Sequence, residues 1–332
     1  MISKKNLKII VLFVILLSDK TAVFTIFTGG EMDIINEIKK LKKEKNAVIL
    51  AHYYTRNEVQ EIADYIGDSY FLSEKARELQ EDIIIMCGVY FMGESVKLLN
   101  PNKKVFIPDM NSDCPMAHMV TLEQIDKKRK EYEDLAVVCY VNSTAEIKSK
   151  SDVCVTSANA IKIVEKLENK NIFFIPDKHL GSYVASQIKD KNIILNDGYC
   201  PIHDALLEKE VNSLKTRYPK AEILVHPECK KEIVKLADFV GSTSGIINYV
   251  NKSSNQEFII CTELGILYEL ESKNPNKIFY YPEPNMECID MKKITLENIY
   301  HTLLNEDNEI IIKDEIQIEA MKPLKKMLQL GR

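Results

Sequence analysis

The chain has 332 residues, of which 45% are hydrophobic and 28% charged, and its formal net charge is −5. This length suits two or three domains, and the composition is that of a globular protein, which excludes a fibrous or largely disordered chain. The acidic balance excludes the electrostatic footprint of a nucleic-acid-binding protein, because no basic stripe with interleaved aromatic residues is present.

The eight cysteines do not form the dense pattern of a small disulfide scaffold. Four of them lie within apolar runs, where a thiol usually behaves as a small buried hydrophobic group: Cys87, Cys139, Cys154 and Cys261. This usage predicts a protein of the reducing cytoplasm, without a membrane partner.

The first 31 residues differ from the rest of the chain. Three lysines precede an apolar run over 9–17, which resembles the charged and hydrophobic regions of a signal peptide. The run is too short to span a bilayer, and no clean small-x-small cleavage site follows it. A Gly-Gly pair directly before Met32 matches a ribosome-binding sequence read as codons. We therefore predict that residues 1–31 are a non-native extension and that translation starts at Met32.

From residue 33 onward, apolar runs alternate with amphipathic segments. A charged amphipathic helix is expected over 33–45. The predicted strands are 47–54, 82–87 and 104–108, then 135–142, 152–156, 171–176 and 193–195, and finally 222–226, 238–241, 257–262 and 277–282. Helices are expected between them, and such alternation predicts parallel sheets with helices on both faces.

Three cysteines recur with nearly equal spacing, each shortly after an apolar run. Cys114, Cys200 and Cys288 are separated by 86 and 88 residues. Polar residues at the ends of other predicted strands keep the same period: His52, Asn142 and His226, followed by Ser69, Ser157 and Thr243. In parallel sheets, functional groups collect at the carboxyl ends of strands. The chain therefore reads as three copies of one unit.

We predict an α/β fold with three similar three-layer αβα domains, whose short parallel sheets surround a pseudo-threefold axis. The expected domains are 32–115, 116–200 and 201–288, with residues 289–332 packing back on the first. This arrangement brings the three thiols to one point. Three thiolates suit either a zinc ion with an open position or a [4Fe–4S] cluster with one iron not bound by protein. Such an iron is a Lewis acid with vacant positions for substrate oxygen atoms.

The hydroxyl residues Ser69, Ser157 and Thr243 are each expected to start a helix. They have two interpretations, which do not exclude each other. A hydroxyl at a helix start caps the first turn, and helix N-termini also bind anions through free N–H groups.

With these residues assembled, the chain resembles the quinolinate synthase family from about residue 32 to 328. The segments that carry the resemblance are AHYY (51–54), GDS (67–69), FMGES (91–95), CPMAH (114–118), CYVNSTAEIK (139–148), VTSANA (155–160), PDKHLGSYVA (176–185), GYCPIH (198–203), HPEC (226–229), GSTSGI (241–246) and MECIDMKKITLENIY (286–300). The resemblance implies a [4Fe–4S] cluster held by Cys114, Cys200 and Cys288.

The implied reaction condenses iminoaspartate with dihydroxyacetone phosphate to quinolinate, with release of phosphate and water, in NAD biosynthesis. The resemblance also implies a functional link to an L-aspartate oxidase or dehydrogenase that produces iminoaspartate. The implied substrate contacts are His52, Ser69, Tyr140, Val141, Asn142, Ser157, His203, His226, Pro227, Glu228 and Thr243.

The catalytic candidates are His52, Tyr54, His226 and Glu228; proton transfer is assigned to the last three, and the resemblance implies that His52 faces the substrate. Histidine suits proton transfer near neutral pH, and we expect burial to raise the pKa of Glu228 enough for it to take part. His203 lies three residues after Cys200. Two interpretations of His203 have equal weight: it forms a hydrogen bond with the ligand Cys200, or it donates a proton to the substrate.

The chain departs from the family pattern in two places. Ser112-Asp113 and His118 stand where the family usually has Ala-Gly and Asp, and Asn196-Asp197 replaces Trp-Pro. Two rival functions stay open. One is a hydro-lyase that uses the same open iron on a hydroxy acid, and the other is a binding protein whose metal is structural.

Overall fold

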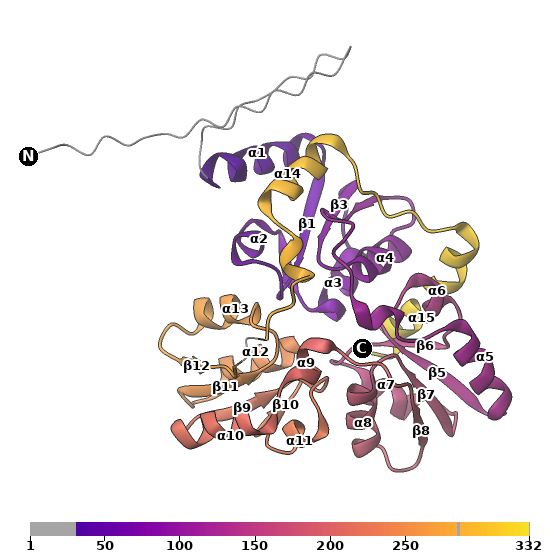
Figure 1. Cartoon of the computed structure of the whole chain (residues 1–332). Coiled ribbons are helices and arrows are strands. Elements are labelled where there is room, and N and C mark those ends of the chain that lie inside the picture. Colours follow the sequence, from indigo (N-terminus) through magenta and orange to yellow (C-terminus); the bar gives the residue numbers. More distant parts are fainter. Residues whose placement is uncertain (1–30, 284–285, 332) are drawn as a thin grey trace, which may run out of the picture.

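The computed structural model describes residues 31–283 and 286–331. Three parallel four-stranded sheets, each flanked by its own helices, form three lobes around a common centre (Figure 1). This confirms the predicted α/β fold with three similar αβα units. The predicted N-terminal extension lies outside the described residues, apart from Glu31, and the domain boundaries stay a prediction.

The first sheet has the strand order β2-β1-β3-β4, with every pair parallel. Its strands are β1 (Ala47–His52), β2 (Tyr65–Gly67), β3 (Ile83–Cys87) and β4 (Lys104–Phe106). The helices of this unit are α1 (Glu31–Glu44), α2 (Asn57–Ile62), α3 (Ser69–Ala76) and α4 (Tyr90–Leu99). The three-residue strand β2 was not predicted from the sequence.

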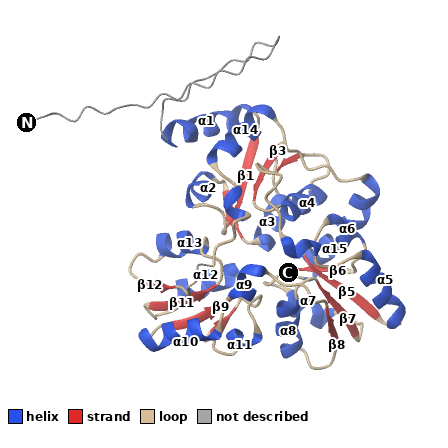
Figure 2. Ribbon diagram, viewed as in Figure 1, coloured by secondary structure: helices blue, strands red, loops and turns tan. Residues whose placement is uncertain are grey.

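The second sheet repeats this order as β6-β5-β7-β8. Its strands are β5 (Leu135–Tyr140), β6 (Val153–Val155), β7 (Asn171–Ile175) and β8 (Asn192–Leu195). The accompanying helices are η1 (Pro115–His118), α5 (Leu122–Glu131), α6 (Ala145–Ser149), α7 (Ala160–Lys166) and α8 (Lys178–Gln187). Helices lie on both sides of the strands in Figure 2.

The third sheet has the order β10-β9-β11-β12. Its strands are β9 (Glu222–Val225), β10 (Phe239–Val240), β11 (Glu257–Cys261) and β12 (Ile278–Tyr280). The helices are α9 (Pro201–Ala205), α10 (Glu208–Arg217), α11 (Lys231–Val234), α12 (Thr243–Lys252) and α13 (Ile266–Lys273). The same crossover pattern in all three units places equivalent strand ends at equivalent points.

The two central strands of each sheet form the core of its unit. All residues of β1, β3 and β5 are buried, as are the last four residues of β7 and of β11. Strands covered by helices on both faces bury every side chain, which explains their continuous apolar runs. The edge strands are shorter or more exposed.

The C-terminal segment contacts two units. After η2 (Met291–Lys293), α14 (Leu296–Asn305) packs against α1, and Ile310 N–H donates to Val105 O of β4 at 2.8 Å. The last helix, α15 (Asp314–Leu330), lies against α6 and β6. The segment therefore contacts the first unit through α14 and Ile310 and the second unit through α15, and the sequence did not indicate the second contact.

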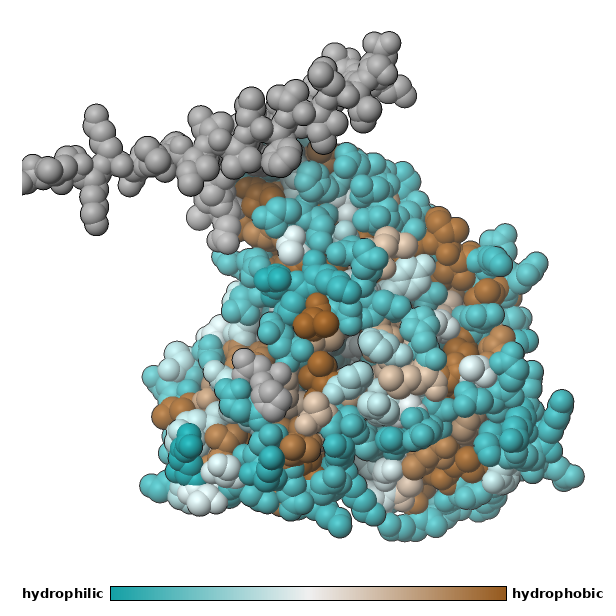
Figure 3. Space-filling model, in the orientation of Figure 1, coloured by the Kyte–Doolittle hydropathy of each residue, from teal (hydrophilic) through white to brown (hydrophobic). Residues whose placement is uncertain are grey.

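The visible face of the molecule is mainly hydrophilic, with hydrophobic residues scattered over it (Figure 3). Among the described residues, no helix combines the length and apolar character needed to cross a membrane.

Candidate active site

A cavity of about 220 Å³ lies where the three units meet. Residues from all three units line it, and they include most of the site residues expected from the sequence. These are His52, Tyr54, Ser69, Cys114, Tyr140, Asn142, Ser157, Cys200, His203, His226, Glu228, Thr243 and Cys288. Two expected contacts, Val141 and Pro227, are buried but are not among the lining residues.

The three cysteines enter the cavity from loops of different units. Burial raises the pKa of the Cys114 thiol, and the negative charges of Cys288 and Glu228 raise it further. Burial also raises the pKa of Cys200, with added effects of Glu228 and Cys114, and that of Cys288 to about 11. All three cysteines line the same cavity. Three soft sulfur donors in a largely apolar cavity fit a cluster of iron and sulfide.

A different donor set overlaps this one. Ligand atoms of Cys200, His203 and Glu228 all lie within 4.8 Å of one another. His203 Nδ1 is 3.1 Å from Cys200 Sγ and 2.9 Å from Glu228 Oε2, distances that suit hydrogen bonds. The same three groups therefore form a hydrogen-bonded unit in the described structure and also a mixed S, N, O set of the kind that zinc accepts.

Glu228 differs from the expectation. Its burial favours the neutral acid, but His203, His226 and a hydrogen bond with Tyr140 favour the carboxylate and together lower its pKa to about 2. The expected upward shift is therefore wrong, because partners that stabilise the carboxylate outweigh the cost of burial. Glu228 is 4% exposed, so its charge acts in a site with little water.

His52 and His226 have the same local geometry at the ends of β1 and β9. Each accepts a backbone N–H from the residue two positions later on its Nδ1, at 3.1 Å for His52 and 3.4 Å for His226. In a neutral ring this leaves Nε2 as the protonated nitrogen. Burial is the largest cause that lowers the pKa of each ring to about 3. Both rings are thus neutral near pH 7, and His226 Nε2 lies 3.2 Å from Ser157 Oγ.

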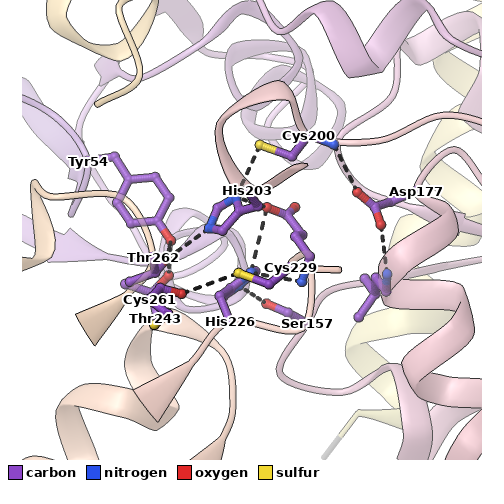
Figure 4. Close-up of polar contacts among 12 residues, drawn as sticks. Tyr54, Ser157, Asp177, Cys200, His203, His226, Cys229, Thr243, Cys261 and Thr262 are labelled. Carbon is purple, nitrogen blue, oxygen red and sulfur yellow. Dashed lines mark hydrogen bonds and ion pairs between the residues drawn. The ribbon is translucent and has the colours of Figure 1, made fainter. Parts of the chain in front are cut away.

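Tyr54 belongs to a chain of hydroxyl groups below the cavity. Its OH lies 2.8 Å from Thr243 Oγ1 and 2.8 Å from Thr262 Oγ1. Thr262 Oγ1 in turn lies 3.0 Å from His203 Nε2 (Figure 4). The chain connects Tyr54 of the first unit to the His203–Glu228 pair, and Thr262 was not among the expected site residues.

The hydroxyl residues at the helix starts are not the caps. Asp68 accepts the N–H of Phe71 at 3.0 Å and caps α3, so Ser69 is the first helical residue. Ser242 accepts the N–H of Gly245 at 3.1 Å and caps α12, which leaves Thr243 Oγ1 to meet Tyr54.

At Ser157, the third of these hydroxyl residues, the helix starts later in the sequence than expected. Helix α7 begins at Ala160, and its cap position is Asn159, so the expected capping role of Ser157 is wrong. Because preceding residues occupy the cap positions at Ser69 and Thr243, all three hydroxyl groups are available to the cavity.

Three buried polar atoms that line the cavity have no hydrogen-bond partner among the described residues. They are Asn142 Oδ1, Thr156 Oγ1 and Glu228 Oε1. Buried polar atoms are almost always hydrogen-bonded, so these three atoms are open to hydrogen bonds from a molecule in the cavity. Thr156 was not expected, although its position next to Ser157 at the end of β6 could have indicated it.

The departures from the family pattern have local partners. His118 Nε2 lies 2.7 Å from Asp113 Oδ2, and both side chains are partly exposed. The Asn196 side-chain amide donates to Met119 O and Pro176 O, both at 2.9 Å. Each replacement is therefore accommodated by hydrogen bonds beside the cysteine loops, without blocking the cavity.

Residues 36–329 match the family model described as quinolinate synthetase A protein. The chain is 54% identical over 301 residues to the quinolinate synthase of Clostridioides difficile strain 630, which covers 91% of this chain and 99% of that protein. It is 56% identical over 296 residues to the quinolinate synthase of Fusobacterium nucleatum, covering 89% and 99% of the two chains. The chain therefore belongs to the quinolinate synthase family and is an enzyme of NAD biosynthesis.

Proposed function

We propose that the chain condenses iminoaspartate with dihydroxyacetone phosphate to quinolinate, with release of phosphate and water, in the cavity between its three units. The observation that supports this most strongly is the joint placement of three cysteines and the proton-transfer candidates around one cavity. The names of the relatives indicate the product, and the cavity has the chemical groups that the reaction requires.

Cys114, Cys200 and Cys288 would hold a [4Fe–4S] cluster. When bound, such a cluster would supply a Lewis-acidic iron that three cysteines leave open to substrate oxygen atoms. No other cysteine is among the described residues that line the cavity, so a fourth thiolate ligand is not offered there. The fit rests on the number and softness of the sulfur donors and on the cavity that they share.

The anionic groups of the substrates suit the helix starts. Helices α3 and α12 begin at Ser69 and Thr243, both of which line the cavity. The positive end of a helix dipole and the hydroxyl groups at these starts favour carboxylate and phosphate oxygens. The unpartnered Asn142 Oδ1 and Thr156 Oγ1 would accept or share hydrogen bonds with the same molecules.

Proton transfer is assigned to His226, Glu228 and Tyr54, with His52 facing the substrate from the first unit. The Glu228 carboxylate can accept a proton from a substrate carbon or nitrogen, and the Nε2–H of the adjacent neutral His226 can donate a hydrogen bond to a substrate oxygen. Their Nδ1–Oε2 separation is 3.6 Å. Tyr54 is neutral because burial raises its pKa well above the ordinary value, so it acts as a proton donor to a developing oxyanion.

A second candidate is favoured by the Cys200–His203–Glu228 set. In that case the protein would hold a single zinc ion, as a hydrolase or a binding protein does, and the other two cysteines would not be ligands. The two candidates differ in their requirement for Cys114 and Cys288.

The test is direct. Purified protein, prepared without oxygen, is supplied with dihydroxyacetone phosphate and with iminoaspartate generated by an L-aspartate oxidase. Quinolinate formation supports the proposal. Dehydration of a hydroxy acid, without an aromatic product in the coupled assay, would instead favour the hydro-lyase.

A further inference from the structure

One backbone connection recurs in all three units and holds each cysteine loop to its sheet. In each unit one central strand (β3, β7 or β11) is followed, three residues after its end, by a residue whose backbone N–H donates a hydrogen bond. The acceptor is the backbone carbonyl of the residue two positions before Cys114, Cys200 or Cys288. The pairs are Tyr90 N to Ser112 O at 2.8 Å, Lys178 N to Gly198 O at 2.8 Å, and Leu264 N to Met286 O at 2.9 Å. The three cysteines therefore have the same register relative to β3, β7 and β11.

In two of the units, the residue before this donor is a buried acid that binds the cysteine itself. Asp177 Oδ2 accepts the backbone N–H of Cys200 at 3.2 Å (Figure 4), and Glu263 Oε1 accepts that of Cys288 at 3.0 Å. Asp177 is 0% exposed and Glu263 is 1% exposed. Both acids stand two residues after a strand end, β7 for Asp177 and β11 for Glu263.

The second oxygen of each acid is also bound, so the carboxylates have fixed orientations. Asp177 Oδ1 accepts Leu180 N–H at 2.7 Å, and Glu263 Oε2 accepts Gly265 N–H at 2.6 Å. Lys292 Nζ lies 3.1 Å from Glu263 Oε1. A buried carboxylate is costly unless such partners satisfy it, so a chain keeps one where its hydrogen bonds serve a purpose.

The first unit lacks this device. Val89 occupies the equivalent position, and the N–H of Cys114 is bound by its neighbour Asp113 through Oδ1 at 2.8 Å. The Asp113 side chain is 44% exposed, so this bond is local and close to solvent. Two of the three cysteines are thus held by buried acids from the end of a neighbouring strand, and the third is not.

Ordinary helix capping does not account for the pair. Asp177 caps α8 through Leu180, but Glu263 is not the cap residue of α13, whose N-cap position is Gly265. The feature that both acids share is the bond to the cysteine N–H. We propose that Asp177 and Glu263 are positioning residues that hold Cys200 and Cys288 in the orientation required for a shared metal group. This inference rests on the proposed function, because the group is the cluster proposed above.

The test uses substitutions that separate capping from positioning. Serine is a good N-cap residue but is too short to span both bonds, so Asp177→Ser should keep the start of α8 and lose the bond to Cys200. Glu263→Gln keeps the size of the side chain and loses one of its accepting oxygens. Asp197→Asn is the matched control, because Asp197 lies in the same loop with a side chain 97% exposed and pairs with Lys178.

Two measurements are made on the full-length protein. The first is the rate at which anaerobically purified protein loses iron to a chelator. The second is the alkylation rate of each cysteine in the metal-free form, resolved by peptide mass spectrometry. We expect Asp177→Ser to lose iron about ten-fold faster or more, and to show faster alkylation of Cys200 with Cys114 unchanged. Glu263→Gln should do the same at Cys288, and Asp197→Asn should match the wild type.

The outcomes separate the inference from the proposed function. One outcome is that the wild type contains iron and sulfide, while Asp177→Ser and Glu263→Gln have the same rates of iron loss and of cysteine alkylation as the wild type. In that case the positioning role is wrong and the proposed cluster stands. If the wild type binds no iron and sulfide, the cluster is wrong, and the inference falls with it.

Discussion

Thr262 Oγ1 lies 3.0 Å from His203 Nε2, although 59 residues separate the two in sequence. The same hydroxyl lies 2.8 Å from Tyr54 OH, so one threonine connects a tyrosine of the first unit to the histidine beside Cys200. Thr262 is 0% exposed, and water therefore cannot replace it readily.

Replacing Thr262 by valine should impair both stability and turnover. The substitution preserves the shape of the side chain but leaves Tyr54 OH and His203 Nε2 without their shared partner, at a cost of about 1–3 kcal/mol in the free energy of unfolding. We expect the rate of quinolinate formation per iron-loaded chain to fall by about ten-fold or more. A ten-fold fall corresponds to an increase of ~1.4 kcal/mol in the activation free energy. Thr262→Ser retains the hydroxyl and is the control; a valine variant with wild-type turnover would exclude this role.

Replacing Glu228 by glutamine should reduce turnover without removing the metal group. The carboxylate Oε2 lies 2.9 Å from His203 Nδ1 and 3.6 Å from His226 Nδ1, and loss of a group that assists proton transfer typically costs ~10²- to 10⁴-fold in rate. Glu232, an exposed residue of α11, provides the matched control as Glu232→Gln. The measurements are quinolinate formation and iron content for each variant. Equal rates for the two variants would show that Glu228 takes no part in the chemistry.

His52 and His226 should stay neutral well below pH 6.5. Their pKa is lowered to about 3, mainly by burial, so His52 and His226 bind no proton in the folded protein between pH 8 and pH 5. The unfolded chain does bind protons as pH falls through 6.5, and folding stability therefore decreases in that direction, by up to ~1.4 kcal/mol per pH unit for each residue.

Histidine ring signals in NMR spectra of the metal-free protein test this directly. The signals of His52 and His226 should not shift between pH 8 and pH 5, whereas in urea all histidines should titrate near their ordinary pKa of ~6.5. A midpoint near 6.5 for either residue in the folded protein would contradict the expected effect of burial.

The buried side chain of Lys148 should stabilise the folded protein through its contact with the loop that follows Asn142. Its side chain is 0% exposed, and its Nζ donates to Ser143 O. Glu94 lies nearby and accepts Ala145 N–H at 2.8 Å, with a pKa raised by burial against the charge of Lys148.

We expect Lys148→Met to lower the free energy of unfolding by about 1–3 kcal/mol, because the Ser143 carbonyl loses its partner. Urea denaturation measures the effect, and Lys150→Met, at an exposed position two residues later, is the control. Equal midpoints for the two variants would show that the buried cation is dispensable.

The sequence predicted the repeated architecture because the repeat is periodic in residue types. Equal spacing of Cys114, Cys200 and Cys288, together with apolar runs between them, indicated three α/β units, and the three sheets share one strand order. Strand β2 escaped prediction because its three residues are short and partly exposed, and its pairing with β1 gives no local signal. Cap positions were shifted by up to two residues, since adjacent polar residues compete for the same role.

The cavity residues were predicted where a family motif or a strand end indicated them. Thr262, Asp177 and Glu263 were missed because each acts through a partner 23 to 59 residues away, which no local pattern records. The direction of the Glu228 pKa shift was wrong for the same reason: burial can be inferred from sequence, but its histidine partners become evident only in three dimensions. Comparing positions two residues after each central strand would have indicated the two acids.

The central claim is that Cys114, Cys200 and Cys288 together hold a four-iron cluster, and analysis of iron and acid-labile sulfide tests it most directly. Protein purified without oxygen should contain about four irons and four sulfides per chain, and each single Cys→Ser variant at these positions should lose most of both. A colourless protein with one zinc, which persists in Cys114→Ser and Cys288→Ser but not in Cys200→Ser, would contradict the account.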